Sequence, residues 1–333
     1  MGRPFISVVV TAYNRREYLK YAVKSVINQT LDKGLYEMIV VKNFRDSEVD
    51  KLIEGNRGRI IEMGDEPIGR YLARGINESE GEVITFLDDD DVYHSRKLER
   101  LYKVFNEDEN LDYYHHNLIA INKYERILNI DIDRVNTYLR IANINDRINV
   151  IKKYGFKCGS GMSAIAIRKR LAYMLAKYVM PYVIDAPDFI TFAFALNYGK
   201  VLIHEPYTLT FYRVHDKNTS KGFEGDLKRV VKRGVRTLIT NYQISRLMQR
   251  FVSYDVELRR RISPEIGYVD IVSSIVIDWK YYVTKYSLEG LLSGIEDASI
   301  HRIAAAMVGL IYLVSPYVAK KIIQWRYFGN KRS

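Results

Sequence analysis

Four consecutive carboxylates, Asp88–Asp91, follow the apolar run Val83–Leu87. A short run of β-branched, aliphatic and aromatic residues is typical of a buried parallel strand. At a separation of about 6 Å and an effective dielectric constant of about 20, neighbouring carboxylates repel by on the order of 1–3 kcal/mol. Open α/β sheets bind ligands beyond the carboxyl ends of their strands, where Mg²⁺ favours one or two carboxylates together with substrate phosphates. The cluster therefore indicates a cation site, and the alternative is a solvated acidic loop that caps a helix near Ser95.

A second polar group, Thr11–Arg15, follows the strand expected at Phe5–Thr11. A hydroxyl, an aromatic ring and a cation at a strand end suit a nucleotide, because Tyr13 would pack on a base and Arg15 would meet phosphate. The alternative is an ordinary turn with a helix cap. The sequence has no Gly-x-Gly-x-x-Gly pattern after this strand and no Walker A motif. Their absence argues against a dinucleotide-dependent oxidoreductase and against a P-loop enzyme.

Strands and helices alternate through the first third of the chain. Strands are expected at Phe5–Thr11, Tyr36–Val41, Arg59–Met63, Val83–Leu87 and Leu111–Tyr114, with helices at Glu17–Asn28, Glu48–Glu54, Ile68–Asn77 and Lys97–Phe105 between them. This alternation predicts βαβ units, an α/β fold and a mostly parallel sheet flanked by helices. Right-handed crossovers would bring the strand ends to one edge of the sheet.

The middle of the chain is less regular. We expect a polar, helical lid or insertion at Asp131–Lys153, a strand at Met162–Ile167 and a helix at Asp188–Leu196, followed by two strands at Val201–Ile203 and Thr208–Tyr212.

The composition is that of an ordinary globular protein, with 47% hydrophobic and 27% charged residues in 333. Cys158 is the only cysteine, which excludes an intrachain disulfide and a multi-cysteine zinc site. The start, Met1–Phe5, carries no signal-peptide pattern, so we expect a cytoplasmic protein.

Positive charge is concentrated near the C-terminus. Residues 225–333 hold 18 Lys and Arg against 9 Asp and Glu, and the remaining residues hold 33 against 31. The basic residues of 228–236 recur at helical spacing and form either a solvated helix face or a surface for an anionic partner. No aromatic residue interrupts this cluster, which argues against stacking on single-stranded nucleic acid.

An apolar segment, Ile303–Ala319, runs for seventeen residues without a charge and contains Pro316. Spanning helices need about 17–25 apolar residues, so three interpretations stay open: a membrane-interface or re-entrant helix, a buried helix or oligomer contact, and a full span. Trp325, Tyr327 and Phe328 among basic residues favour the interface, which would place the protein peripherally on the cytoplasmic face of a membrane.

Four segments in this order resemble a family-2 glycosyltransferase: Ser7–Arg15, Ser25–Thr30, Gly69–Arg74 and Gly81–Asp91. The resemblance spans roughly residues 5–220. It implies a GT-A (nucleotide-diphospho-sugar transferase) fold and inversion at the anomeric carbon. The domains expected on this basis are a catalytic domain at 1–222 and a basic, mainly helical C-terminal region at 223–333.

The resemblance also implies roles for particular residues. Asp188, in Asp185-Ala-Pro-Asp188, would be the catalytic base. A divalent cation, Mg²⁺ or Mn²⁺, would be held by Asp88, Asp90 and His215. The nucleotide sugar would be bound by Thr11, Tyr13, Arg15, Asn43, Arg70, Arg74, Asp88 and Asp89.

Two positions depart from the family pattern. Lys42 stands where the family carries a carboxylate that contacts the base, so the base cannot be carried over from the family. Gly75 stands where the family has an asparagine after Ala-Arg.

The expected function is metal-dependent, inverting transfer of a sugar from a nucleotide-diphosphate donor to an acceptor hydroxyl. The acceptor would be a glycan, a lipid-linked molecule or a protein. The basic and apolar C-terminal region favours an acceptor close to a membrane. No nucleic-acid partner is expected. The alternatives are a metal-dependent nucleotidyltransferase or phosphohydrolase, and a non-enzymatic basic protein that binds membranes or nucleic acid.

Overall fold

The computed structural model describes residues 2–130, 132, 134–215, 300–319 and 321–322, together with five positions between 240 and 248. The chain divides into two compact units, Met1–Lys221 and Gly222–Ser333, each considered by itself below. The assignment of catalysis to 1–222 and of a basic helical role to 223–333 stays a prediction.

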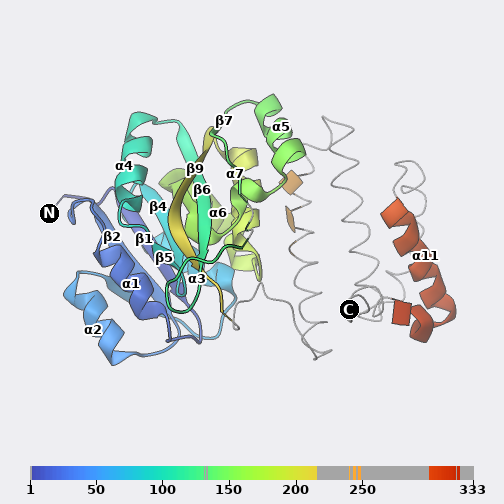
Figure 1. The fold of residues 1–333 in the computed structure, drawn as a ribbon, viewed down its shortest axis with the longest axis horizontal. Coiled ribbons are helices and arrows are strands. Elements are labelled where there is room, and N and C mark those ends of the chain that lie inside the picture. The colour runs from blue at the N-terminus through green and yellow to red at the C-terminus, as the bar shows by residue number, and fades with distance from the viewer. Residues whose placement is uncertain are drawn as a thin grey trace. The chain divides into compact units, whose positions relative to one another are not determined.

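One mixed sheet forms the centre of the first unit, in the order β3-β2-β1-β4-β8-β6-β9-β5, with β7 paired to β9 (Figure 1). Strands β1 to β4 pair in parallel, as do β6 and β9, whereas β8 runs antiparallel between β4 and β6. The strands are β1 Ile6–Ala12, β2 Tyr36–Lys42, β3 Arg59–Glu62, β4 Val83–Asp88, β5 Val92–Tyr93, β6 Leu111–Ile121, β7 Leu139–Ile141, β8 Ile165–Arg168 and β9 Val201–Arg213. The predicted α/β fold with a mostly parallel sheet is confirmed.

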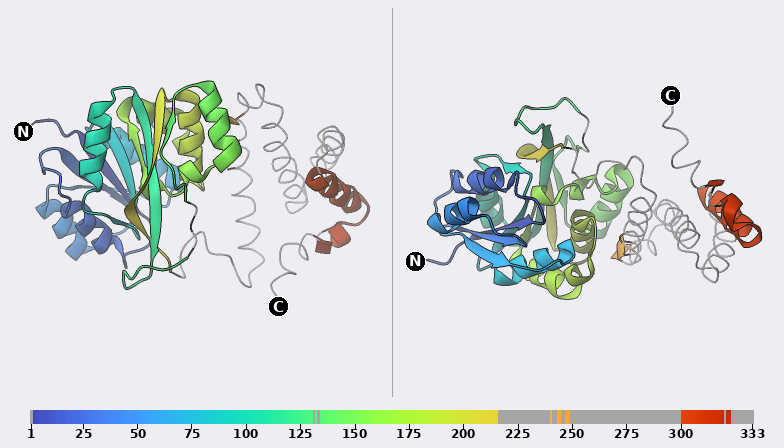
Figure 2. Two further views of the ribbon diagram at one scale, coloured as in Figure 1. Left: turned by 45° about the horizontal axis from the view of Figure 1, so that its top comes forward. Right: turned by 90° about the horizontal axis from the view of Figure 1, so that it is seen from below.

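Helices cover both faces of this sheet, with α1 and α2 on one face and α3 on the other (Figure 2). Ile6, Val8 and Val10 of β1 pack in the core with α1, α2 and α4, while Val9 faces α3. Burial on both faces explains why β1 is an uninterrupted apolar run. The helices are α1 Leu19–Ile27, α2 Ser47–Gly55, α3 Ile68–Glu78, α4 Lys97–Glu107, α5 Ile144–Tyr154, α6 Lys169–Tyr178 and α7 Pro187–Tyr198, with short 3₁₀ turns η1 Lys157–Gly159, η2 Met162–Ala164 and η3 Met180–Tyr182.

The helix predicted at Asp131–Lys153 is wrong over most of its length. The helix α5 begins only at Ile144, where Asn143 and Asp146 form a capping box, and β7 precedes it. Upstream of β7, Val135 is tied to the side chain of Asn117, whose Oδ1 accepts from the Val135 N–H at 3.0 Å. Tertiary pairing of this segment overrides its polar, helix-like pattern.

Two further strand predictions need correction. The strand expected at Met162–Ile167 begins at Ile165, because Met162–Ala164 form a 3₁₀ turn. The two strands expected at Val201–Ile203 and Thr208–Tyr212 are one strand, β9. Its pairing with β6 slips between His116 and Asn117, opposite Glu205 and Thr208. Pro206 lies in that irregular stretch, where a residue without an N–H is tolerated.

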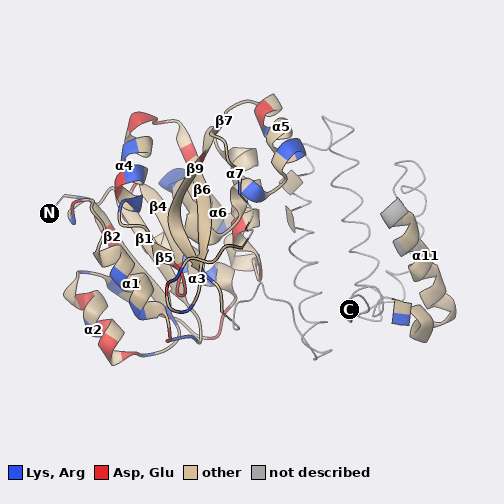
Figure 3. Ribbon diagram, in the orientation of Figure 1, with Lys and Arg blue, Asp and Glu red and all other residues tan. Residues whose placement is uncertain are grey.

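In the second unit, α11 runs from Ile300 to Val314, and Figure 3 shows no charged residue in the part of this helix that is not drawn in grey. It ends two residues before Pro316, because a proline disfavours helical backbone at the residue preceding it. Of the helices in the described part of the chain, none is long and apolar enough to cross a bilayer. The interface and buried-helix interpretations stay predictions, and the basic cluster 228–236 and Trp325, Tyr327 and Phe328 lie outside the described residues.

Helix α3 lies so close to β1 that only glycine fits at position 75. A Cβ added there would lie 2.2 Å from Cγ1 of Val9, far inside the normal contact distance. The asparagine of the family pattern could therefore not be accommodated here unless α3 moved away from the sheet.

We predict that Gly75→Ala lowers the free energy of unfolding by about 1–3 kcal/mol through overpacking. Gly55, at the end of α2, is a matched control, because an added Cβ there meets nothing within 4 Å. Gly55→Ala should be neutral or should stabilise by up to about 1 kcal/mol, since alanine favours helix over glycine. Urea unfolding of both variants checks this, and equal stability of the two would contradict the close approach.

Buried histidines lie where β6 pairs with β9. His115 Nδ1 lies 2.8 Å from His204 Nδ1, and His115 Nε2 lies 3.0 Å from the carbonyl oxygen of Ser160. Burial, followed by the charge of His204, lowers the pKa of His115 from 6.5 to about 3. His115 therefore stays neutral in the folded protein at pH values where it is protonated in the unfolded chain.

This difference predicts a loss of stability in acid. As the pH falls from about 7.5 to about 5, the unfolded chain takes up a proton at His115 and the folded protein does not. This uptake should lower the free energy of unfolding by about 2 kcal/mol. The His115→Gln variant should therefore lose less stability over this range than the wild type. Urea unfolding at both pH values measures the difference, and the same loss in the two proteins would show that His115 titrates normally.

Candidate functional site

The site begins where β1 and β4 end side by side. The register pairs Thr11 with Asp88, and Thr11 Oγ1 lies 3.5 Å from Asp88 Oδ1. The N–H of Asp89 donates to the carbonyl oxygen of Thr11 at 3.2 Å. The parallel pairing thus places the first turn and the acidic cluster together, as their positions at strand ends predict.

The acidic cluster is largely withdrawn from water. Asp89, Asp90 and Asp91 are buried, and burial followed by the charges of Asp90 and Asp89 raises the pKa of Asp88 to about 7. Burial also raises the pKa of Asp89 to about 7, against the opposing hydrogen bond from Arg15. The pKa of Asp91 is raised well above its ordinary value by burial and by its acidic neighbours. The raised pKa values mean that the cluster resists carrying its full negative charge near neutral pH, and a bound cation would stabilise the charged carboxylates.

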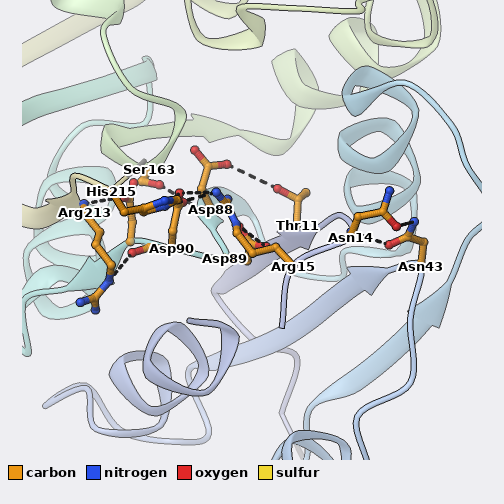
Figure 4. A network of polar contacts seen from close by, with 11 residues as sticks. Thr11, Asn14, Arg15, Asn43, Asp88, Asp89, Asp90, Ser163, Arg213 and His215 are labelled. Atoms are coloured by element: carbon orange, nitrogen blue, oxygen red, sulfur yellow. Dashed lines mark hydrogen bonds and ion pairs between the residues drawn. The ribbon is translucent and has the colours of Figure 1, made fainter. Parts of the chain in front are cut away.

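Arg15 and His215 contact this cluster from two distant parts of the chain. The Arg15 guanidinium binds both carboxylate oxygens of Asp89, and its Nη1 lies 2.8 Å from Asp90 Oδ2. His215 Nε2 lies 3.0 Å from the same oxygen of Asp90. Hydrogen bonding to Asp89 and the charges of Asp89, Asp90 and Asp88 outweigh the effect of burial and raise the pKa of Arg15. Figure 4 shows this network running from Arg213 and His215 to Asn14 and Asn43.

Arg213, a residue without an assigned role in the sequence, fixes the far side of the cluster. Its backbone N–H donates to Asp91 Oδ1 at 3.1 Å, and its Nε donates to the carbonyl oxygen of Asp90 at 2.9 Å. The guanidinium is fully buried and also binds Glu125. Since Arg213 ends β9, these bonds set the position of His215 two residues further on. The signal in the sequence is the position of Arg213 two residues before the predicted ligand His215.

The turn Gly161–Ser163 joins the cluster to Asp188. Ser163 Oγ accepts from the Asp88 N–H at 3.0 Å, and the Gly161 N–H donates to Asp188 Oδ2 at 2.8 Å. Gly161 has φ +84, and a Cβ there would lie 2.5 Å from Leu118, so this position requires glycine. The local sequence pattern gives no sign that this turn contacts the Asp88 backbone and the Asp188 carboxylate.

Asp188 lies in the first turn of α7, directly after Pro187. The residue before them, Ala186, has the left-handed φ of 43, which stores strain at the entry to the helix. Burial raises the pKa of Asp188, while hydrogen bonds from Gly161 and from the helix N-terminus oppose the rise. The charge of Asp188 in turn raises the pKa of Asp88. Asp188 is thus a carboxylate close enough to the cluster to interact with it electrostatically and shifted toward taking up a proton.

Asn43 meets the first turn through an amide pair with Asn14. The Asn14 N–H donates to Asn43 Oδ1 at 2.8 Å, and Asn43 Nδ2 donates to Asn14 Oδ1 at 2.9 Å. Lys42, at the position of the family carboxylate, has a fully buried side chain that binds Asp50 at 3.0 Å and the carbonyl oxygen of Phe44 at 2.5 Å. The end of β2 therefore offers amide groups from Asn43, while the lysine ammonium is engaged with Asp50 and Phe44.

The backbone conformation and the side chain of Asn14 contribute separately to the stability of the folded protein. Asn14 has φ 54, a conformation that costs most residues about 1–2 kcal/mol. We predict that Asn14→Gly loses only the hydrogen bond that Asn14 Oδ1 accepts from Asn43, about 1 kcal/mol, because the backbone N–H of residue 14 remains. Asn14→Ala should lose the left-handed preference as well. Urea unfolding should rank the wild type above Asn14→Gly and Asn14→Ala last, and an alanine variant as stable as the glycine variant would contradict the backbone assignment.

Tyr13, Arg70 and Arg74 each have a polar partner outside the acidic cluster. The Tyr13 hydroxyl donates to Asp65, and its ring is 42% exposed. Arg70 pairs with Glu66, and Arg74 pairs with Glu78, through contacts of 3.0 Å along α3. The structure thus brings Thr11, Arg15, Asp88, Asp89, Asp90 and His215 together, but it gives Arg70 and Arg74 acidic partners outside the cluster.

The donor set suits a cation shared with a ligand better than a cation held by protein alone. Within the described residues, no group of three or more His, Cys, Asp or Glu side chains is arranged to hold a metal ion. Asp90 and His215 are in contact, and Asp88 lies two residues before Asp90. Mg²⁺ commonly takes only one or two carboxylates from the protein and completes its shell with water and substrate phosphates, so these residues fit that mode of binding.

Comparison with protein families finds that the model for glycosyl transferase family 2 matches residues 7–170. Among curated proteins, glycosyltransferase AglE of Haloferax volcanii is 35% identical over 105 residues, which cover 29% of this chain and 34% of AglE. An uncharacterized glycosyltransferase of Methanocaldococcus jannaschii is 32% identical over 119 residues, which cover 34% of this chain and 41% of that protein. The chain thus matches less than half the length of these relatives.

Among solved structures, residues 1–349 of S. aureus TarS superpose with a TM-score of 0.56 at 14% identity, over 93% of this chain and 91% of that one. The same TarS fragment has been solved in complex with UDP-GlcNAc, and that structure matches with the same TM-score at 15% identity. At such identities the likeness shows that the folds agree.

Proposed function

We propose that this chain, which carries a glycosyl transferase family 2 domain over residues 7–170, moves a sugar from a nucleotide-diphosphate donor to an acceptor hydroxyl with inversion. One observation carries the proposal. The turn Gly161–Ser163 binds both the strand-end cluster at Asp88 and a separate carboxylate, Asp188, at the start of α7. Such a site offers one group of carboxylates to hold a cation for the leaving diphosphate and another carboxylate for the acceptor proton.

The first turn and the end of β2 would hold the nucleotide. Thr11 and Arg15 lie directly beside Asp88 and Asp89, and the Asn14–Asn43 pair lies at the opposite end of the network. This order suits a ligand whose diphosphate lies near Arg15 and whose base lies toward Asn43, because guanidinium favours phosphate and an amide offers both a donor and an acceptor. The neighbouring Tyr13 ring, more than a third exposed, is available to pack on the nucleoside.

Asp88, Asp90 and His215 are the residues that would hold a divalent cation with the donor. When bound, such a cation offsets the charge that develops on the leaving diphosphate. Arg15 would add positive charge on the same side, because its guanidinium already reaches Asp89 and Asp90.

Asp188 would act as the general base. Its carboxylate takes the proton from the acceptor hydroxyl, whose oxygen forms a bond to the anomeric carbon while the bond from that carbon to the diphosphate oxygen breaks. Burial raises the pKa of Asp188 and so favours proton uptake, while the bond from Gly161 holds the carboxylate in place. Attack from the face opposite the diphosphate gives inversion.

The family 2 domain favours this function over a nucleotidyltransferase or a phosphohydrolase. The products separate the three, because sugar transfer releases a nucleoside diphosphate, whereas the alternatives release pyrophosphate or phosphate. A membrane-proximal acceptor is the part of the proposal that rests on sequence, namely on the excess of 18 basic over 9 acidic residues in 225–333 and on the apolar segment 303–319.

We predict that Asp188→Asn lowers the rate of transfer by about 100-fold or more, because an amide cannot take up the acceptor proton. The substitution preserves size and leaves an oxygen to accept from Gly161, so binding of the nucleotide with Mn²⁺ should change little. A screen of nucleotide sugars with Mg²⁺ or Mn²⁺, read as nucleoside diphosphate release, identifies the donor used for the measurement.

Asp185→Asn is the matched control for this test. Asp185 lies three residues earlier, and its Oδ1 accepts from the Ala186 N–H at 3.1 Å, a bond that an asparagine oxygen preserves. This variant should keep most of the activity. Full transfer by Asp188→Asn would remove Asp188 from the mechanism.

A further inference from the structure

The guanidinium of Arg15 lies between the side chains expected to bind a cation. Its Nη1 is 2.8 Å from Asp90 Oδ2 and 3.4 Å from His215 Nε2, which are themselves 3.0 Å apart. Its Nη2 and Nε bind the carboxylate of Asp89. One terminal nitrogen thus touches two of the three predicted metal ligands at once.

A divalent cation and this guanidinium cannot use Asp90 in the same way at the same time. A bound Mg²⁺ lies about 2.0–2.1 Å from its ligand oxygens, and in such a position it would crowd and repel a guanidinium nitrogen that contacts the same oxygen. Arginine, in contrast, binds phosphate groups through two parallel hydrogen bonds and is well suited to a diphosphate.

We propose that Arg15 takes the place of the cation in the free protein and leaves it for the diphosphate of the donor, so that cation and nucleotide bind as a coupled pair. This inference rests on the proposed function of the site and assigns a further role to Arg15 within it. Arg15 would keep the cation from binding tightly alone and would strengthen its binding when a diphosphate is present. The coupling is reciprocal, because each ligand strengthens the binding of the other by the same factor.

The surroundings allow Arg15 to move while its partners stay in place. The Arg15 side chain is 21% exposed, whereas those of Asp89 and Asp90 are 3% and 8% exposed. Arg15 belongs to the turn between β1 and α1. In this turn Asn14, the residue before Arg15, is held by Asn43. On the other side, the bonds of Arg213 to Asp90 and Asp91 hold the acidic segment independently of Arg15.

The test measures binding of Mn²⁺ alone, by electron paramagnetic resonance, to the full-length protein and its variants. Arg15→Met should bind Mn²⁺ at least about tenfold more tightly than the wild type, because the competing cation is gone. The same variant should bind nucleoside diphosphate, measured with UDP and with GDP in the presence of Mn²⁺, at least about tenfold more weakly. These opposite changes are specific to a residue that competes with one ligand and binds the other.

Two further variants separate this role from a general effect of charge. Arg16→Met removes the same charge from the adjacent, exposed residue, whose guanidinium lies over Phe44, and it should leave Mn²⁺ binding near that of the wild type. Arg15→Gln keeps hydrogen-bond donors without the charge and should behave like Arg15→Met, which keeps the test valid if the methionine variant does not fold.

Mn²⁺ binding by Arg15→Met and Arg15→Gln that is no tighter than binding by the wild type would overturn the inference, as would an equal increase in Arg16→Met. Such a result leaves the proposed sugar transfer unaffected, because that proposal is tested by the products and by Asp188→Asn. Conversely, tighter Mn²⁺ binding by the Arg15 variants supports the inference whether or not a nucleotide sugar is turned over.

Discussion

Negative charge held out of water at the end of β4 is the constraint that the surrounding structure must satisfy. Asp89, Asp90 and Asp91 are all buried, and the pKa of Asp89 is raised to about 7 even with a guanidinium bound to it. Buried charges of one sign destabilise a fold unless they are paired, hydrogen-bonded or neutralised. The first turn, the turn before β8 and the end of β9 each contribute a group to this task.

Two contributions come from segments at the partners of β4, namely β1 and β8, and the third comes from β9, which pairs with β5 just after the cluster. The parallel pairing of β1 brings Arg15, the antiparallel β8 follows the turn that contains Ser163, and β9 delivers Arg213 and then His215. A mixed sheet suits this arrangement, because reversing β8 returns a turn to the edge where the parallel strands end. The cluster is therefore compensated by groups fixed in the fold, and the one exception is Arg15, whose side chain reaches it from a turn.

The sequence predicted the elements whose apolar pattern is local and missed the contacts that depend on distant segments. β4 and the carboxylates after it are recognisable because burial on both faces gives an unbroken apolar run that ends abruptly in charge. Ser163 and Arg213 lie 75 and 123 residues from the partners they bind, and no periodicity within their own segments reports such a contact. The sequence also does not predict where the Lys42 side chain points, since a long side chain at a strand end can turn toward the ligand or toward the neighbouring helix.

The same residue type performs different tasks in this site because its surroundings differ. Asp89 is bound by a guanidinium, whereas Asp188 is bound by backbone N–H groups at a helix start and keeps a raised pKa because of burial. Although burial raises the pKa of Asp89 as well, the Arg15 guanidinium occupies both of its carboxylate oxygens, which keeps them from meeting an acceptor hydroxyl. Asp188, which no arginine neutralises through an observed ion pair among the described residues, is better suited to take up a proton. The division between a cluster that balances charge and a carboxylate that moves a proton therefore follows from what each one contacts.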